Sequence, residues 1–321
     1  MIEDRISRVA VFGTGQMGPG IAATSALAGC TTTLVGRSAG AVERGKASCL
    51  AALDFLLAHE VISQQERRTA GANLTFTQDQ AVAAPADLMI EAIAENLAVK
   101  QQFFSEMEAL FAPETILASN TSALRITDIA AGLKRPERAV TAHFWNPPHL
   151  VPLVDVMQGE MTSEETVQRV YHFLKRCGKR PVLGRKDVPG QIGNRLQAAL
   201  MREAFYMVQE GIASVEDVET AIKAGFGLRL PVYGPLEHSD LVGIDLAVAV
   251  ESTILPSLCN ATEPLAVLRN MAAAGNLGAK TGQGFYNWHE RSAEQVRRER
   301  DEFLVDRMKV ARRDRGTQEQ A

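Results

Sequence analysis

A histidine and an aspartate, His143 and Asp155, are the two side chains in this sequence whose types and spacing best suit acid–base chemistry. They fall on or beside two apolar runs rich in β-branched residues, Arg138–Ala142 and Leu150–Met157, which predict two strands joined by a loop that holds two prolines. An imidazole exchanges a proton near neutral pH, and a carboxylate that accepts from its Nδ1–H leaves Nε2 free for the reaction. We therefore predict that Asp155 orients His143 and that His143 takes or gives a proton.

A glycine-rich loop follows the first predicted strand, Arg8–Phe12, and precedes a predicted helix, Ile21–Ala28. Gly13 permits a tight turn, Gly15 lets the backbone approach a pyrophosphate, and Gly18 allows the helix to pack closely on the strand. The N-terminus of the helix then faces the anion. This order of elements predicts a dinucleotide site formed by Gly13, Thr14, Gly15, Gln16, Met17 and Gly18.

The end of the second predicted strand, Thr31–Val35, bears on the choice between NAD and NADP. An NAD-binding fold usually has an acid there that binds the ribose 2′-hydroxyl, whereas this chain has Gly36, Arg37 and Ser38. A guanidinium and a hydroxyl suit a 2′-phosphate. NADP is therefore the favoured cofactor, and NAD is the alternative because loss of the acid can also produce a site that tolerates both.

Three further polar residues stand where predicted elements begin or end. Ser122 closes a run of small polar residues after the strand Thr115–Ala118, where it caps the next helix, faces the cofactor crevice, or does both. Asn194 lies in the first turn of a long helix, where an amide can point into the crevice between domains. Arg229, after a glycine-rich turn, either binds a substrate carboxylate through two hydrogen bonds or is a solvated loop charge. The residues alone leave these alternatives open.

The pattern of predicted elements changes near Lys186–Gly190. Before this point short apolar strands alternate with helices, which predicts a doubly wound, Rossmann-like α/β sheet. After it the apolar periodicity is helical, as in Leu241–Leu258 and Ala293–Arg312. A chain of 321 residues suits two domains. We predict a dinucleotide-binding domain over residues 1–187 and an all-α substrate and dimerisation domain over residues 188–321.

Composition excludes several classes of function. The net charge of −4 and the pI of about 5.9 argue against nucleic acid or an anionic membrane as a partner. The four cysteines form no CxxC pair and no metal-ligand spacing, so we expect no metal site. No apolar run approaches the ~18 residues of a membrane span, and the first residues lack a signal-peptide pattern. We expect a cytoplasmic protein that acts on a small molecule.

With these residues in view, the chain resembles the L-3-hydroxyacyl-CoA dehydrogenase family over nearly its full length. The blocks that carry the resemblance are GTGQMGPGIA (13–22), DLMIEAIAENLAVK (87–100), ASNTSALRIT (118–127), AHFWNPPHLVPLVDV (142–156), KDVPGQIGNRL (186–196) and KTGQGFY (280–286). The resemblance implies a Rossmann-like N-terminal domain, an α-helical C-terminal domain that forms a homodimer, and an active site between the two domains.

The resemblance also assigns roles to individual residues. His143 matches the catalytic histidine of the family's HFxNP motif, and Asp155 stands where the family has a glutamate that orients this histidine. Ser122 and Asn194 match a serine and an asparagine that bind the reacting oxygen. Asp155 is one methylene shorter than the family's acid.

Three charged residues match positions that contact the nicotinamide cofactor in the family, namely Glu95, Lys100 and Lys280. On position alone, Glu95 and Lys100 would be read as ordinary helix-start charges. Gly36 replaces the family's aspartate, which agrees with the preference for NADP inferred above.

The substrate is where the match to acyl-CoA enzymes weakens. Members that hold coenzyme A use a serine and a lysine on the helix after the second strand, but the corresponding stretch, Leu50–Arg67, has no lysine. The segment GFGLR (225–229) is similar to the branch that acts on free hydroxy acids, such as L-gulonate and carnitine dehydrogenases, and HFWNPPHLVPLVDVMQGE is similar to the branch that acts on a pyridine carboxylate in vitamin B6 breakdown. We expect an NAD(P)-dependent dehydrogenase of a small 3-hydroxy carboxylate bound by Arg229. The alternatives are an acyl-CoA dehydrogenase and a non-catalytic dinucleotide-binding structural protein.

Overall fold

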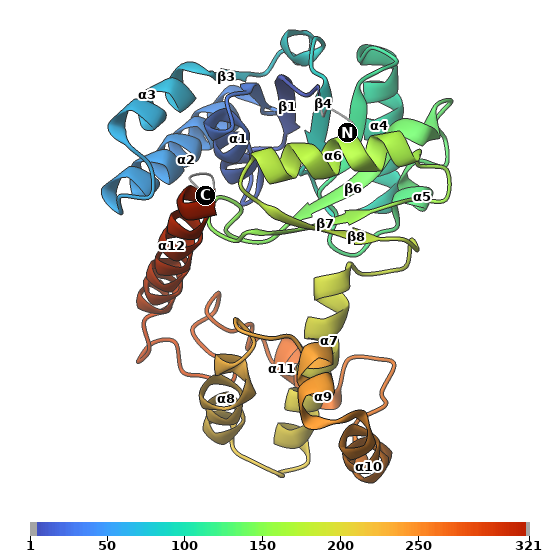
Figure 1. Cartoon of the computed structure of the whole chain (residues 1–321), viewed down its shortest axis with the longest axis vertical. Helices are drawn as coiled ribbons and strands as arrows, with labels where there is room; N and C mark the ends of the chain where they lie inside the picture. The colour runs from blue at the N-terminus through green and yellow to red at the C-terminus, as the bar shows by residue number, and fades with distance from the viewer. Residues whose placement is uncertain (1–4, 319–321) are drawn as a thin grey trace. The chain divides into compact units, whose positions relative to one another are not determined.

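The structure is a computed structural model, and it describes residues 5–318 (Figure 1). The chain forms two compact units. The first unit contains the residues up to Asn194 together with those from Arg298 onward, and the second unit contains residues 195–297. The sequence predicts a single boundary between residues 187 and 188. The units of the structure differ from it because part of the C-terminal helix belongs to the first unit.

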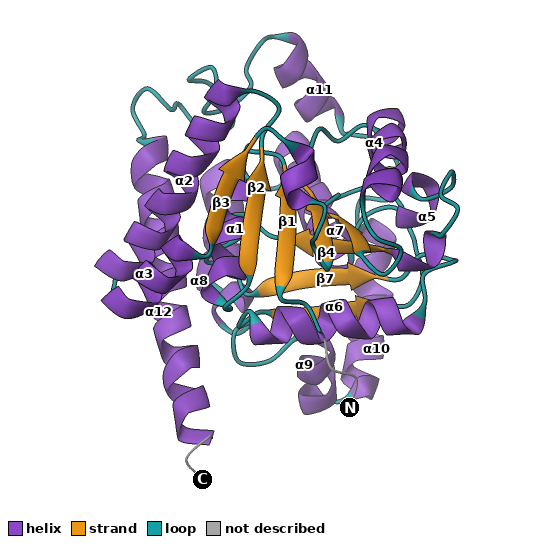
Figure 2. Ribbon diagram, turned by 90° about the horizontal axis from the view of Figure 1, so that it is seen from above, coloured by secondary structure: helices purple, strands orange, loops and turns teal. Residues whose placement is uncertain are grey.

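The described residues of the first unit form an eight-stranded sheet of order β3-β2-β1-β4-β5-β6-β7-β8, drawn in orange in Figure 2. The strands are β1 (Arg8–Phe12), β2 (Thr31–Val35), β3 (Leu74–Thr77), β4 (Leu88–Glu91), β5 (Ile116–Ser119), β6 (Ala139–Phe144), β7 (Leu153–Met157) and β8 (Arg180–Gly184). Neighbours from β3 to β6 are parallel, β7 is antiparallel to β6, and β8 is parallel to β7. This sheet confirms the predicted Rossmann-like architecture.

Helices cover both faces of the sheet in the first unit and make up most of the second. They are α1 (Gly18–Leu27), α2 (Ala39–Ala58), α3 (Gln64–Ala72), α4 (Leu97–Leu110), α5 (Ile126–Ile129), α6 (Glu164–Arg176), α7 (Ile192–Gln209), α8 (Val215–Ala224), α9 (Pro235–Val242), α10 (Ile244–Ile254), α11 (Ala266–Ala273) and α12 (Ala293–Gln318). Helix α7 begins in the first unit and continues into the second, and α12 does the reverse. Among the described residues, no helix has the length and apolar content that crossing a membrane requires.

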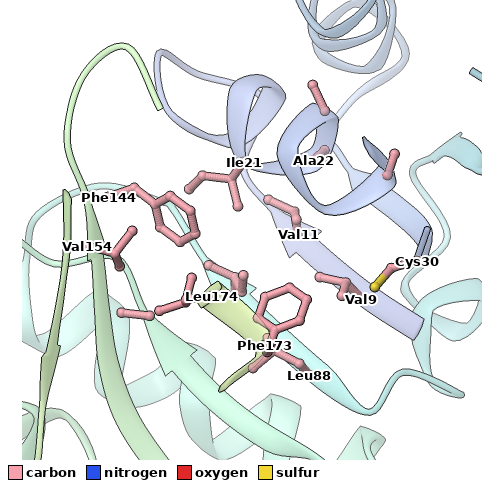
Figure 3. Packing of buried hydrophobic residues seen from close by; sticks show 14 of the residues in the cluster. Val9, Val11, Ile21, Ala22, Cys30, Leu88, Phe144, Val154, Phe173 and Leu174 are labelled. Carbon is pink, nitrogen blue, oxygen red and sulfur yellow. The ribbon is translucent and has the colours of Figure 1, made fainter. Parts of the chain in front are cut away.

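The strands of the first unit divide their apolar side chains between two clusters. Val9 and Val11 of β1 pack with α1, α2, α3 and α6, whereas Ala10 and Phe12 pack with α4 and α5 on the other face. Figure 3 shows part of the first cluster, with Phe144 of β6 among its members. Because successive side chains of a strand point to opposite faces, His143 points away from this cluster.

The loop between β6 and β7 both begins and ends later in the chain than the sequence predicts. Strand β6 continues through His143 to Phe144, since the register pairs Phe144 with Val154. Strand β7 begins at Leu153 and not at Leu150. The backbone N–H of Leu150 donates to the carbonyl of Pro147 in a turn and is therefore not available to a neighbouring strand. The histidine is therefore held by a strand end and not by a loop.

The helices of the second unit also differ from the prediction in one place. The sequence predicts a single helix over Leu241–Leu258, but α9 ends at Val242 and α10 begins at Ile244. Gly243 between them has φ of 99°, a left-handed conformation that glycine adopts without strain and that ends a helix. The prediction of one helix was therefore wrong at its N-terminal end.

Candidate active site

His143 and Asp155 lie directly opposite each other on antiparallel strands. The register pairs the two residues, and the side chains of such a pair meet on one face of the sheet. His143 Nδ1 is 3.2 Å from Asp155 Oδ2, and Asp155 has none of its surface exposed. The structure thus brings the predicted pair together, with Nε2 of the imidazole free of any hydrogen bond to the described residues. Its catalytic role stays a prediction.

Asp155 accepts two more hydrogen bonds that the sequence did not reveal. Trp145 Nε1 donates to Oδ2 over 2.9 Å, and the backbone N–H of Gly193 donates to Oδ1 over 3.2 Å. Burial raises the pKa of Asp155, but the hydrogen bonds from His143, Trp145 and Gly193 outweigh burial and hold this pKa below its ordinary value. The carboxylate is therefore ionised at neutral pH. One signal was present in the sequence: Trp145 follows the end of β6 directly, and the alternation of the extended chain places it on the same side as His143.

Glu95 organises the loop that contains Ser122. Its Oε1 accepts from Thr121 Oγ1 over 2.7 Å and from the backbone N–H groups of Ser122 and Ala123 over 3.0 and 3.1 Å. Burial raises the pKa of Glu95, but the Thr121 hydroxyl, the Lys100 charge and the two N–H groups lower it further, so that the net shift is downward. Glu95 is consequently an anion that holds the Ser122 backbone in place.

Helix α7 connects this loop to the histidine–aspartate pair. Asn194 Nδ2 donates to the backbone carbonyl of Ser122 over 3.0 Å, while the adjacent Gly193 donates to Asp155. Two neighbouring residues in the first turn of α7 therefore contact both parts of the candidate site. The structure brings Ser122, Asn194 and Glu95 together, as their resemblance to family positions implies, and their binding of a reacting oxygen or cofactor stays a prediction.

Lys100 is buried, with about 1% of its surface exposed. Its ammonium lies 2.6 Å from Glu91 Oε1 and 3.3 Å from Glu95 Oε2. Glu91, at the end of β4, also accepts from Ser119 Oγ over 2.6 Å. Lys100 thus neutralises a buried acid and orients Glu95. Sequence reasoning missed Glu91, although an acid at the end of an apolar strand in DLMIEAI was a visible signal.

The glycine loop has the geometry that a dinucleotide requires. Gly13 has φ of 115°, and a Cβ there would lie 2.3 Å from the carbonyl oxygen of Ala92. A Cβ at Gly18 would lie 1.8 Å from the carbonyl oxygen of Gly13, whereas a Cβ at Gly15 would meet no atom within 4 Å. Helix α1 starts without a side-chain cap, which leaves its first N–H groups for an anion. These features fit a bound pyrophosphate.

The segment after β2 has a glycine, Gly36, at the position where an NAD-binding fold usually has an acid. A Cβ at Gly36 would lie 2.8 Å from Val42 Cγ2 and 3.1 Å from Thr14 Cγ2. Ser38 Oγ accepts from the backbone N–H of Ala41 and caps α2. Arg37 is exposed, and its side chain forms no hydrogen bond or ion pair with the described residues. Position 36 therefore has no room for an acidic side chain, and the neighbouring guanidinium is available.

Arg229 and Lys280 belong to the second unit. Arg229 follows a 3-10 turn over Phe226–Leu228, and both Arg229 and Lys280 are exposed. Their side chains have no hydrogen-bond or ion-pair partner among residues 5–318. What these two cations bind stays a prediction.

Comparison with known families covers almost the whole chain. The model of the 3-hydroxyacyl-CoA dehydrogenase NAD binding domain matches residues 8–188, and that of the 3-hydroxyacyl-CoA dehydrogenase C-terminal domain matches residues 190–288. Both matches agree with the resemblance drawn from the motif blocks. Helix α12 lies beyond the second match.

Two curated relatives illustrate the range of the family. The chain is 32% identical over 300 residues to the 5-formyl-3-hydroxy-2-methylpyridine 4-carboxylate 5-dehydrogenase of Mesorhizobium japonicum, with 94% of this chain and 96% of the relative covered. It is 36% identical over 293 residues to a probable 3-hydroxybutyryl-CoA dehydrogenase of Bacillus subtilis, with 90% of this chain and 99% of the relative covered.

Two solved structures represent the same two kinds of enzyme, one that acts on a pyridine carboxylate and one that acts on an acyl-CoA. A crystal structure of 5-formyl-3-hydroxy-2-methylpyridine 4-carboxylic acid 5-dehydrogenase, described as an NAD+-dependent dismutase, matches with a TM-score of 0.89 at 32% identity and covers 96% of this chain and 99% of its own. A crystal structure of (S)-3-hydroxybutyryl-CoA dehydrogenase from Ralstonia eutropha matches with a TM-score of 0.74 at 33% identity and covers 88% of this chain and 99% of its own. The chain is therefore a member of the 3-hydroxyacyl-CoA dehydrogenase family, an oxidoreductase that carries the NAD-binding domain of that family.

Proposed function

We propose that this protein interconverts a secondary alcohol and a ketone on a small 3-hydroxy carboxylate, with NAD or NADP as the redox partner. The observation that carries the proposal is the buried hydrogen bond between His143 Nδ1 and Asp155 Oδ2, which leaves Nε2 to exchange a proton. A bound nicotinamide would supply the hydride acceptor or donor.

The side chains of the first unit then divide the remaining work. His143 Nε2 removes the hydroxyl proton of the substrate, and the ionised Asp155 stabilises the imidazolium that forms. Ser122 and Asn194 position the substrate oxygen as it becomes a carbonyl. An amide nitrogen has two donors, so Asn194 keeps one for the substrate while the other binds the Ser122 carbonyl.

The substrate class is supported by the comparison of relatives. The structure matches the pyridine-carboxylate enzyme with a TM-score of 0.89 over 96% of the chain, against 0.74 over 88% for the acyl-CoA enzyme. Arg229 is exposed and suits a carboxylate through two parallel hydrogen bonds. An acyl-CoA substrate is the second candidate, because the identity to 3-hydroxybutyryl-CoA dehydrogenases reaches 36%.

The preference for NADP over NAD is part of the proposal. It is supported by the packing of Val42 and Thr14 against Gly36, which leaves no space for an acid that would select NAD. Arg37 would then bind the 2′-phosphate, and Ser38 would lie beside it. An NAD-dependent relative argues in the other direction, so both cofactors belong in any assay.

The protein also acts as a homodimer in this proposal. The second unit has only Val218 and Cys259 buried among its apolar residues, while Leu236 is 83% exposed and Leu241 is 69% exposed. Exposed apolar surface of this extent is typical of an interface. The four described cysteines are thiols that form no disulfide, which suits the reducing cytoplasm.

A single assay tests the proposal. Purified wild-type protein is incubated with free 3-hydroxy acids, pyridine carboxylates and 3-hydroxyacyl-CoA thioesters, each with NAD and with NADP, and reduced nicotinamide is followed by absorbance. Turnover of a free acid at a higher kcat/KM than any thioester supports the proposal, and the reverse order replaces it with the acyl-CoA candidate.

The His143→Gln variant tests the proposed base in the same assay. We expect its kcat to fall at least ~100-fold while dinucleotide binding is retained, because positioned general-base catalysis contributes at least that much. His172→Gln, on the helix α6, is the matched control and should keep full activity. Near-normal turnover by His143→Gln would remove His143 as the base.

A further inference from the structure

Trp145 shares one carboxylate oxygen with His143. Its Nε1–H donates to Asp155 Oδ2 over 2.9 Å, and His143 Nδ1 lies 3.2 Å from the same oxygen. The indole and imidazole rings meet edge to face, with centroids 5.6 Å apart and planes inclined by 61°. Two donors on one oxygen compete for the same negative charge.

The indole is held in this position by a close fit to helix α7. A Cβ on Gly193 would lie 2.5 Å from Trp145 Cζ2, so the ring occupies the space that any other side chain at residue 193 would need. The backbone N–H of Gly193 donates to Asp155 Oδ1. Both oxygens of the carboxylate therefore have donors, and Trp145 is fixed by the residue that binds the second oxygen.

The surroundings of Asp155 contain one titratable partner among the described residues that contact it. Strand β6 places His143 opposite Asp155, and strand β8 places Val182 opposite it on the other side. Trp145 and Gly193 contribute neutral N–H groups. The charge of Asp155 is thus divided between one imidazole, one indole and one backbone amide.

We propose that Trp145 is a positioning residue that limits how strongly Asp155 draws the Nδ1 proton of His143. The indole N–H holds Oδ2 in line with the imidazole and takes up part of the carboxylate charge, which weakens the hydrogen bond that Asp155 accepts from His143. This inference rests on the proposed role of His143 as the base.

The test measures the protonation of His143 directly. The full-length protein is labelled with 13C at the Cε1 of histidine and titrated by NMR, and the His143→Gln variant identifies the resonance of His143. In Trp145→Phe the carboxylate loses one of two donors on Oδ2 and interacts more strongly with the imidazolium. We expect the titration midpoint of the His143 resonance to move upward by about 0.5 to 1 pH unit.

Three further proteins make the result specific. Replacement of Trp145 by 3-benzothienylalanine keeps the shape of the indole ring and removes only its N–H. It should therefore raise the midpoint as Trp145→Phe does, and it serves as the test if the smaller phenyl ring of Trp145→Phe destabilises the fold. Trp288→Phe removes the only other tryptophan and should leave the midpoint unchanged. Asp155→Asn removes the charge and should move the midpoint downward.

An unchanged or lowered midpoint in both the Phe and the benzothienyl proteins would overturn the role of Trp145. The titration needs no substrate, so it also separates this inference from the proposed function. If no hydroxy acid is turned over but the midpoint rises, the proposed substrate class fails and the role of Trp145 stands. If a hydroxy acid is turned over, the acid limb of the kcat/KM profile of Trp145→Phe should rise by the same amount as the midpoint.

Discussion

The two units of this protein place their apolar side chains in opposite ways. In the first unit the sheet and its helices bury residues such as Phe173 and Leu88 completely. In the second unit the helices α7, α9, α10 and α11 have no buried residue. The first unit therefore has an extensive apolar core, whereas the second unit exposes most of its apolar side chains, as the proposed homodimer would require.

The candidate functional residues follow the same division. In the first unit, Asp155, Glu95 and Lys100 each have two or more described partners. In the second unit, Arg229 and Lys280 are exposed and without described partners. The residues of the proposed proton transfer are held by several partners, whereas the cations proposed to contact the substrate (Arg229) and the cofactor (Lys280) are exposed. Each of the following predictions tests one side of this contrast.

The largest effect is expected in the core of the first unit. Phe173→Ala removes a side chain with none of its surface exposed, and such a change costs about 3–5 kcal/mol of unfolding free energy. Urea unfolding measures the loss, which should not depend on protein concentration. Phe303→Ala, at a residue that is 60% exposed, is the matched control and should cost less than about 1 kcal/mol. Equal losses of unfolding free energy in Phe173→Ala and Phe303→Ala would mean that burial of Phe173 does not stabilise the first unit.

A pH-dependent loss of stability is expected from His149 in the first unit. Burial and the nearby Lys179 charge lower the pKa of His149 from 6.5 to about 4 in the folded protein. Between these two values the unfolded chain binds more protons, so the folded state loses stability as the pH falls from 6.5 towards 4. The loss amounts to about 3 kcal/mol when the pH is below both values.

The His149→Phe variant isolates this effect, since phenylalanine cannot bind the proton. Unfolding free energies of wild type and variant are compared at pH 7.5, 5.5 and 4. Their difference should move in favour of the variant as the pH falls. A constant difference across this range would show that His149 is not buried as the structure has it.

A smaller effect, on association, is expected in the second unit. Leu241→Lys places a charge on the exposed apolar surface and should weaken the proposed homodimer at least ~100-fold, because an unpaired charge is costly in an apolar interface. Light scattering after gel filtration should then give the mass of one chain, 34.8 kDa, at concentrations where wild type gives twice that mass. Glu290→Lys is the control for the added charge. If wild type is itself monomeric, the apolar surface of the second unit has another role.

Loss of the Arg229 guanidinium should affect one class of substrate. Arg229→Met is expected to raise KM for free hydroxy carboxylates by about 10- to 100-fold and to change KM for thioesters much less, because only the former present a carboxylate to it. Arg202→Met, another arginine of the second unit, serves as the control. A larger effect on thioesters would favour the acyl-CoA candidate.

The smallest effect is expected for the cofactor preference in the first unit. Arg37→Ala should weaken NADPH binding about 10-fold and leave NADH binding nearly unchanged, since only NADPH has a 2′-phosphate. Fluorescence titration of both cofactors measures the change, with Arg44→Ala as the control on the same segment. Equal weakening of both cofactors would remove Arg37 as the discriminating residue.

Sequence patterns predicted the parts of this molecule that depend on local order. The strand, glycine loop and helix at the N-terminus, and the pairing of His143 with Asp155, follow from periodicity and from the antiparallel return of the chain. The burial of Lys100 against Glu91 and the bond from Trp145 to Asp155 did not, because they depend on side-chain directions across several strands. The sequence also did not predict that most of α12 belongs to the first unit, since the apolar residues of this helix are few and widely spaced.

Helix α12 has a consequence for the order in which the protein folds during synthesis. Val305 of this helix is 2% exposed within the apolar cluster of the first unit, where Leu304 and Met308 also pack. The ribosome releases these residues only after the whole second unit has been made. A nascent chain that ends at residue 194 therefore carries an uncovered apolar patch on its sheet domain, the kind of surface that engages chaperones or aggregates. The apolar cluster that begins with β1 is therefore completed only when α12 packs against it.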